Sequence, residues 1–455
     1  MPMSLKTILF LATFVAACGG TLYHPLLGVI AYMMHYQMGL EQQWWAGGPV
    51  QSWGIRYSLT LAIFTFLGII LNRQKVRLGG RFLEPQEMLI LVFVALVWIC
   101  HLLNPSPDPQ LGENPAEVKL TKVAIFLLML THVVTTQWRL NVMFWALVAG
   151  SLFLGYQAFT APGWMFVGNR LDVIGGPDFR NSNALAAFLA ACLPIIGIQF
   201  LVSGWKGRVL CAVSSGFTVN AIVLTRARGA VVGLASGLAV ALLAAPKGKR
   251  MIILAGIALV AAAGYALTDP GFWERASTVT AAEEERDTSA QSRIDIWRGS
   301  LRMLSAHPLG IGPENFKRTI GDYAAEHAGR DAHNTYVLAY SELGLQGLLA
   351  FLFLAGNAGL LLRRIVKECK ELPGEHGDRL RWYAYAVGLA LSIYLACSLT
   401  LSTLYLEFPY WLLAMPICIW RALQNTKADL ACASVPNRIA VARRSASGSG
   451  SVAVS

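Results

Sequence analysis

Long apolar segments, separated by short polar stretches, recur along the whole chain. Most have about 17–25 residues, the length that a helix needs to cross the hydrocarbon core of a bilayer. The pattern therefore predicts an all-α, polytopic membrane protein of about twelve transmembrane helices. The expected spans lie at roughly 56–72, 85–103, 118–136, 139–160, 183–202, 209–225, 228–245, 251–268, 333–362, 382–402 and 411–422.

The first apolar region, about 5–38, is too long for one span, and Gly19, Gly20 and Pro25 interrupt it. One net crossing there, with both termini in the cytoplasm, is the prediction that we favour. Two full crossings, with the N-terminus outside, form the alternative.

The charged residues are few and unevenly placed. The chain has 455 residues, of which 55% are hydrophobic and 14% charged, and its formal net charge is +11. The lysines and arginines concentrate in short loops, which predicts cytoplasmic loops of a membrane protein and no nucleic acid partner. These groups are Arg73, Lys75, Arg77 and Arg81; Lys206 and Arg208; Lys247, Lys249 and Arg250; and Arg363, Arg364, Lys367 and Lys370.

One polar segment, 269–332, is longer than the others and carries more acidic than basic residues. Within it, Ile294, Trp297, Leu301 and Leu304 recur at intervals of three and four, the pattern of an amphipathic helix. We expect a small helical cap whose apolar stripe lies against the membrane domain. The expected organisation is transmembrane helices 1 to about 9 in 1–268, the large periplasmic loop in 269–332, C-terminal transmembrane helices in 333–422 and a disordered cytoplasmic tail in 423–455.

Several arginines stand at the expected outer ends of the spans. Arg226 and Arg228 lie between two apolar runs, where they either cap a tight turn and reach the interface or form an anion site. Arg293 lies on the amphipathic helix and is either a solvated residue or part of a site. Arg180 precedes a span that Asn181 or Asn183 can cap.

His333 stands where the polar segment ends and the next apolar run begins. An imidazole has an unperturbed pKa near neutrality, so it can take up or release a proton at the pH of the periplasm. Placed at the junction of cap and membrane beside arginines, it is suited to removing a proton from a hydroxyl group.

The stretch from His333 resembles the signature of the O-antigen ligase family, a GT-C-like ligase and polymerase superfamily. His333-Asn334 is followed by nine residues and then by Gly344-Leu345-Gln346-Gly347. Three further stretches resemble family motifs: Arg293 to Trp297 followed by Pro308-Leu309-Gly310-Ile311-Gly312, Arg228-Gly229-Ala230, and Phe179-Arg180-Asn181-Ser182-Asn183-Ala184. The family pattern after the arginine is Arg-x3-Leu, whereas Arg228 is followed by Val232, so either Arg226 or Arg228 is the equivalent residue.

The resemblance implies a multi-pass enzyme of the bacterial inner membrane whose active site faces the periplasm. Its expected reaction transfers a glycan from undecaprenyl diphosphate to a hydroxyl of lipid A–core oligosaccharide, with inversion and without a cofactor or metal. The other partners are membrane lipids. An O-antigen polymerase or a protein O-oligosaccharyltransferase of the same superfamily is the alternative, and a secondary transporter is a more distant one.

Residue roles follow from the same resemblance. We expect His333 to be the catalytic base and Arg228 and Arg293 to bind the diphosphate, together with Arg226 or Arg180. The expected supporting residues are Asn334, Gly344 and Gly347.

Overall fold

The computed structural model describes residues 4–40, 43, 53–106, 114–167, 170–179, 181–244, 250–251, 254, 288–372 and 374–447. The helices are α1 (Leu5–Tyr23), α2 (Pro25–Met38), α4 (Tyr57–Leu71), α5 (Pro85–Leu103), α6 (Ala116–Val133), α7 (Gln137–Phe159), α8 (Ser182–Val202), α9 (Trp205–Thr225), α10 (Arg228–Ala244), α13 (Thr288–Ala306), α14 (Phe316–Thr319), α15 (Thr335–Cys369), α16 (Glu375–Cys397) and α17 (Phe408–Ser447). Short 3-10 turns are η3 (Arg73–Lys75), η4 (Gly163–Met165), η5 (Pro177–Phe179), η8 (Ile320–Asp322) and η9 (Ala325–His327). One antiparallel pair of two-residue strands, β1 (Phe166–Val167) and β2 (Arg170–Leu171), completes the described elements.

The prediction of an all-α polytopic membrane protein is confirmed. Among the described residues, 7 helices are long and apolar enough to cross a membrane: α1, α5, α7, α8, α9, α15 and most of α16. The helices α4 and α10 are apolar but shorter. The predicted span at 251–268 lies almost wholly outside the described residues, so the count of about twelve spans stays a prediction.

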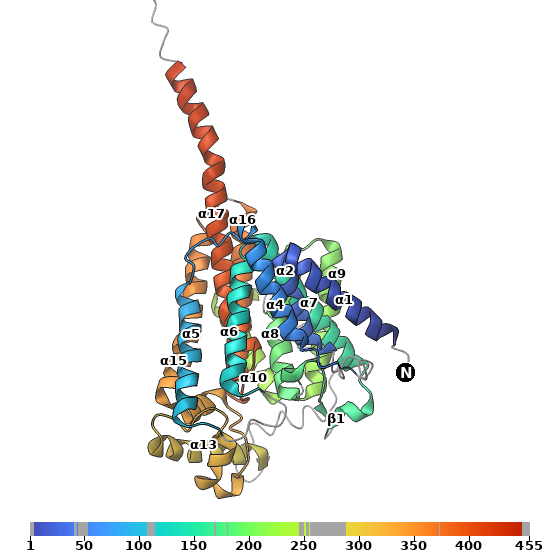
Figure 1. The fold of residues 1–455 in the computed structure, drawn as a ribbon, viewed down its shortest axis with the longest axis vertical. Helices are drawn as coiled ribbons and strands as arrows, with labels where there is room; N and C mark the ends of the chain where they lie inside the picture. Colours follow the sequence, from blue (N-terminus) through green and yellow to red (C-terminus); the bar gives the residue numbers. More distant parts are fainter. Residues whose placement is uncertain are drawn as a thin grey trace, which may run out of the picture.

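The helix α8 lies at the centre of one half of the bundle, where it packs against α7, α9, α10 and α16. The helices α5, α15 and α17 pack against one another in the other half. At one end α13 forms part of a cap below α5 and α15, whereas α17 projects from the opposite end (Figure 1). The cap thus covers the end of the bundle where His333 and the first residues of α15 lie.

The helices α1 and α2 form a hairpin, and contacts at both ends show its direction. The Leu22 carbonyl accepts a hydrogen bond of 2.7 Å from the Asn72 side chain, just after α4 ends. The rings of Phe10 and Phe14 pack against Tyr57, the first residue of α4. The beginning of α1 therefore lies at the same end of the bundle as the beginning of α4. This arrangement agrees with the alternative of two crossings and not with the single net crossing that we favoured.

Composition predicts a disordered tail over 423–455, of which 448–455 lies outside the described residues, whereas 423–447 continues α17. Its alanines favour helix, and polar side chains near the beginning of the segment contact the bundle. Asn425 donates a hydrogen bond of 2.8 Å to the Thr135 carbonyl, and Lys427 forms an ion pair of 2.9 Å with Glu368. Composition alone does not reveal these contacts, which hold the first two turns of the segment in place.

The first and fourth basic groups meet at the end of the bundle opposite the cap. Arg77 contacts Asp429 of α17 at 2.8 Å, and the Arg364 guanidinium lies over the ring of Trp420, also in α17. This arrangement is what the clustering of lysine and arginine predicts for loops that share one side of a membrane.

Candidate functional site

The residues His333 and Asn334 lie immediately before the first residue of α15. The Asn334 side chain accepts hydrogen bonds from the backbone N–H groups of Tyr336 and Val337, at 2.9 and 3.2 Å, and so caps the helix. His333 precedes this cap and has a φ of 47°, in the left-handed region. That conformation turns the chain from the cap into α15 and places the imidazole at their junction.

The environment of His333 keeps its imidazole neutral. The side chain is partly buried, and burial lowers its pKa below the ordinary value of 6.5. The Asp331 carboxylate raises the pKa, while the cations Arg293, Lys317 and Arg330 lower it further. A neutral imidazole at pH 7 has a free lone pair that can accept a proton.

The side chain of Trp297 joins α13 to the loop that carries His333. The Trp297 Nε1 donates a hydrogen bond of 2.9 Å to the carbonyl of Ala332, the residue before His333. Arg293 lies four residues before Trp297 in α13, so both side chains share one face of that helix. The Trp297 bond thereby holds the Arg293 face of α13 next to the imidazole.

The buried face of α13 differs from the predicted stripe. Trp297 and Leu304 are partly buried as expected, but Leu301 is 57% exposed. The fully buried side chains are Ile296, Ser300 and Met303. The reason is that α13 packs against both α15 and η8, so its buried face is centred between these two neighbours. Periodicity predicts that such a face exists, but not where its neighbours lie.

The two glycine-rich stretches of the sequence form one structural unit. Gly344 has a φ of 70° and a ψ of −178° and breaks α15. A helix break frees carbonyl oxygens from their usual partners. Here the N–H of Ile311 bonds the Ser341 carbonyl at 3.0 Å, and the N–H of Gly312 bonds the Glu342 carbonyl at 2.9 Å. The loop after α13 thus replaces the missing turn of α15.

The close approach at this break requires glycine. A Cβ built on Gly344 would lie 2.6 Å from the carbonyl carbon of Leu309 and from the carbonyl oxygen of Pro308. A Cβ built on Gly347 would overlap the Cβ of Leu343. The supporting roles expected for both glycines therefore have a steric reason.

A buried carboxylate that the sequence analysis missed lies just before the break. The Glu342 side chain accepts hydrogen bonds from the Phe316 N–H at 3.0 Å and from the Tyr405 hydroxyl at 2.6 Å. It therefore links α15 both to the cap and to the loop between α16 and α17. An acidic residue inside an apolar run is costly and is usually retained for a role, and this was the signal that could have identified it.

The loop 398–407 holds the beginning of α15 from the side opposite the cap. The Thr335 hydroxyl donates to the Leu401 carbonyl at 2.7 Å. The Ser402 hydroxyl donates to the Asp331 carboxylate at 2.8 Å. The residues on either side of His333 are therefore both fixed to this loop.

The residue after Arg228 contacts the same loop from α10. This residue, Gly229, packs against Thr400 so closely that a Cβ would overlap the threonine hydroxyl. The Cys397 thiol also contacts the Gly229 carbonyl at 3.3 Å. The loop 398–407 thus lies between the turn that carries Arg228 and the residue pair that carries His333. Arg293 is close enough to lower the pKa of the imidazole, and the residue after Arg228 contacts the same loop that holds the residues beside His333.

The turn that contains Arg226 and Arg228 is tight, as one of the two open interpretations requires. Arg226 has a φ of 49° and ends α9.

A further arginine, which the sequence analysis missed, joins this turn to the start of α8. The Arg170 side chain donates to the Thr225 carbonyl at 3.0 Å and to the Asn183 side chain at 2.7 Å.

Arg180 lies outside the described residues, so its position stays a prediction. Its neighbour Asn181 is the N-cap of α8, because its side chain accepts a hydrogen bond of 2.8 Å from the Asn183 N–H. The capping interpretation of this asparagine is therefore confirmed.

A second set of buried acids lies among the loops at the same end of the bundle. Asp178 forms an ion pair of 2.7 Å with Lys119 and accepts a hydrogen bond of 2.9 Å from the Glu407 N–H. Burial, with the nearby Asp178 charge, raises the pKa of Glu407 to about 8. Trp411 donates to this carboxyl at 3.0 Å.

Within the described part of the chain, no three His, Cys, Asp or Glu residues are placed to hold a metal ion.

The fold and this site define an integral membrane protein whose helical cap closes over a histidine among cations. Residues 212–352 match the family model described as O-antigen ligase. The match runs from α9 into α15 and includes Arg226, Arg228, Arg293 and His333. The match supports the assignment to the O-antigen ligase superfamily, and so to membrane enzymes of the ligase or glycosyltransferase type. No curated protein matches the chain.

Proposed function

We propose that the protein transfers a glycan from undecaprenyl diphosphate to a hydroxyl of lipid A–core oligosaccharide, at the periplasmic face of the inner membrane. One observation carries the proposal. His333, with a lowered pKa, stands at the junction of cap and bundle among the cations Arg293, Lys317 and Arg330.

The imidazole of His333 acts as the general base. It accepts the proton of the acceptor hydroxyl while that oxygen attacks the anomeric carbon of the glycan. The bond between the anomeric carbon and the diphosphate oxygen breaks, and undecaprenyl diphosphate leaves with the electron pair. Direct displacement inverts the anomeric centre. A positioned base of this kind contributes about 10²–10⁴-fold to the rate.

The cations stabilise the leaving group without a metal ion. Negative charge grows on the diphosphate as its bond to the sugar breaks, and guanidinium groups bind phosphate oxygens through two parallel hydrogen bonds. At about 4 Å and an effective dielectric constant near 20, one such contact is worth roughly 4 kcal/mol before desolvation is subtracted. Arg293 and Arg228 are the proposed diphosphate ligands, together with Arg226 or Arg180. Lys317 and Arg330 are proposed as further ligands, because their charges also act on His333.

The test is transfer by the purified protein from an undecaprenyl-diphosphate glycan, with chelator present and with lipid A–core, a second lipid-linked glycan and a hydroxyl-bearing peptide as parallel acceptors. We expect transfer to lipid A–core. A longer lipid-linked glycan as the product would instead identify a polymerase, and a glycosylated peptide a protein O-oligosaccharyltransferase.

The histidine has a matched control in the same cap. We expect His333→Ala to reduce the transfer rate by about 10²–10⁴-fold. His307→Ala removes an exposed histidine of the cap and should leave the rate unchanged. Full transfer by His333→Ala would rule out the base.

A further inference from the structure

A cavity of about 480 Å³ opens between α5, α15 and α17, at the end of the bundle opposite the cap. Its polar lining includes Arg81, Gln86, Asn357 and Arg364, and its apolar lining includes Leu361 and Trp420. By the distribution of lysine and arginine, this is the end expected to face the cytoplasm. The cavity is therefore separate from the proposed transfer site.

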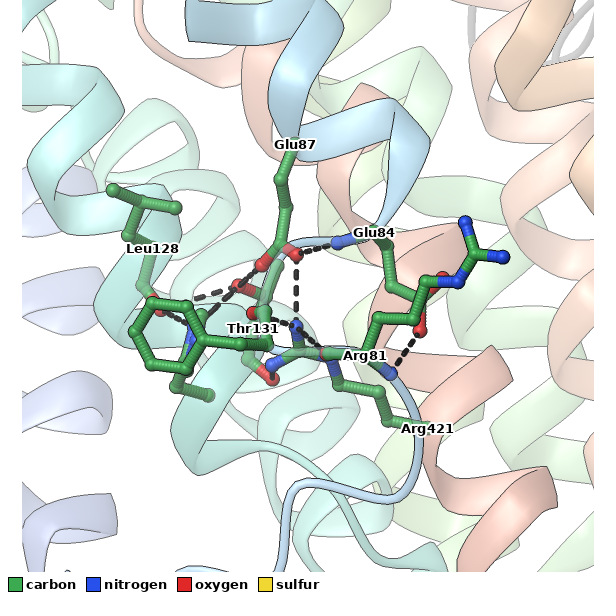
Figure 2. A network of polar contacts seen from close by, with 8 residues as sticks. Arg81, Glu84, Glu87, Leu128, Thr131 and Arg421 are labelled. Atoms are coloured by element: carbon green, nitrogen blue, oxygen red, sulfur yellow. Dashed lines mark hydrogen bonds and ion pairs between the residues drawn. The ribbon is translucent and has the colours of Figure 1, made fainter.

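The two arginines of this cavity are held differently, Arg364 through its side chain and Arg81 through its backbone. The Arg364 guanidinium lies 4.4 Å from the centre of the Trp420 ring, and its Nε bonds the Glu368 carboxylate at 2.9 Å. The backbone N–H of Arg81 bonds the Glu84 carboxylate at 3.0 Å, while its guanidinium points away from the neighbouring polar network (Figure 2). A group bound between them would meet two guanidinium groups.

A buried arginine fixes the segment that carries Arg81. The Arg421 side chain is fully buried and donates to the carbonyls of Arg81 and Phe82, at 3.2 and 2.9 Å, and to Glu87 at 2.8 Å (Figure 2). Because Arg421 follows Trp420 in α17, the same helix positions the aromatic wall of the cavity and its basic rim. The backbone and the aromatic wall of the cavity are therefore preorganised, which lowers the entropic cost of binding.

Exposed apolar side chains continue from the cavity along the two helices that flank it. On α15, Leu360 lines the cavity, and Phe353, two helical turns earlier on the same face, is 63% exposed. On α5, Met88 and Val92 are 54% and 58% exposed and lie one turn apart. A basic cavity at the end of such a surface has the shape and polarity to bind a lipid headgroup with its acyl chains alongside.

We propose that this cavity binds the phosphate group of an anionic phospholipid from the leaflet on the side opposite the cap, with the acyl chains along α5 and α15. Glu84 also lines the cavity, but its carboxylate accepts backbone hydrogen bonds at the start of α5. With Arg81 and Arg364 positive and Glu84 negative, the charged lining has a net charge of +1. Guanidinium groups favour a phosphate with no neighbouring ammonium group.

The experiment is a lipid titration of the detergent-purified full chain, followed by native mass spectrometry. Phosphatidylglycerol is the anionic probe, phosphatidylethanolamine the zwitterionic one, and inorganic phosphate the free-phosphate one. We expect the wild type to prefer phosphatidylglycerol, and the double variant Arg81→Gln/Arg364→Gln to bind it about tenfold more weakly or worse.

Two further variants make the result specific. Arg208→Gln removes another arginine that lies over an aromatic ring, that of Phe200, but Arg208 does not line the cavity, so binding should be unchanged. Leu361→Trp fills the cavity without changing charge and should weaken phosphatidylglycerol binding, which provides a test if the double variant does not fold.

Three outcomes would overturn the proposal. They are equal retention of phosphatidylglycerol by the wild type and by folded cavity variants, an equal loss in Arg208→Gln, and binding of inorganic phosphate without lipid. None of them bears on glycan transfer at the cap, which the His333 variant tests separately.

Discussion

The two ends of the helical bundle differ in how their charged side chains are partnered. At the end opposite the cap, the buried Arg421 donates to Glu87 and to three backbone carbonyls, so its charge is met within the protein (Figure 2). At the cap end, the charged groups that shift the His333 pKa are, among the described residues, three cations and only one carboxylate, Asp331. The first arrangement joins helices, whereas the second places mainly positive charge around the imidazole of His333.

The largest expected effect is a loss of stability when the ion pair at the end opposite the cap is broken. Glu87→Ala leaves Arg421 buried without its carboxylate, which should reduce the free energy of unfolding by about 3–5 kcal/mol. Thermal unfolding in detergent measures this loss. The double variant Glu87→Leu/Arg421→Met should recover most of the stability. An unchanged unfolding temperature for Glu87→Ala would contradict the role of this ion pair.

The next effect distinguishes two glycines of the same helix. Gly344→Ala places a Cβ at a φ of 70° and against Pro308, which should cost about 1–3 kcal/mol and lower glycan transfer. Gly356→Ala is the control, because a Cβ there meets no described residue within 4 Å, so its stability should be equal or slightly higher. Unfolding midpoints and transfer rates of both variants test the break in α15. Equal behaviour would contradict it.

The smallest effect is a change in pH dependence at the cap end. The His333 pKa is lowered, and the base must be neutral, so transfer should be lost only as the pH falls below the ordinary value of 6.5. Lys317→Gln removes a lowering charge and should move this acid limb to higher pH. Asp331→Asn removes a raising charge and should move it to lower pH. Each shift is expected to be about one unit or less, and shifts in the same direction would contradict the assignment.

The sequence predicts the elements better than their contacts. Apolar runs of membrane length identify most of the spans, because the bilayer fixes that length. The His333-Asn334 pair identifies the start of α15, but the break at Gly344 lies inside a run that is predicted as one span, 333–362. Lys317 and Arg330 could not be predicted as neighbours of His333, because only the folding of the cap brings them there.

Local sequence patterns also do not predict how helices are oriented. The direction of the α1–α2 hairpin depends on packing against α4, and the buried face of α13 depends on two neighbours at once. Glu342 and Arg170 act through partners distant in the chain, so neither has a local motif.

The most direct test of the central claim, that cations at the cap end bind the diphosphate, compares two arginines of α13. The charge of Arg293 lowers the pKa of His333, whereas the Arg298 side chain is 69% exposed and lies 3.7 Å from Asp295. The measurement is kcat/KM for the undecaprenyl-diphosphate donor with Arg293→Gln and Arg298→Gln. We predict a loss of about 10–100-fold for Arg293→Gln and less than about twofold for Arg298→Gln. Equal values for both variants, whether unchanged or equally reduced, would contradict the account.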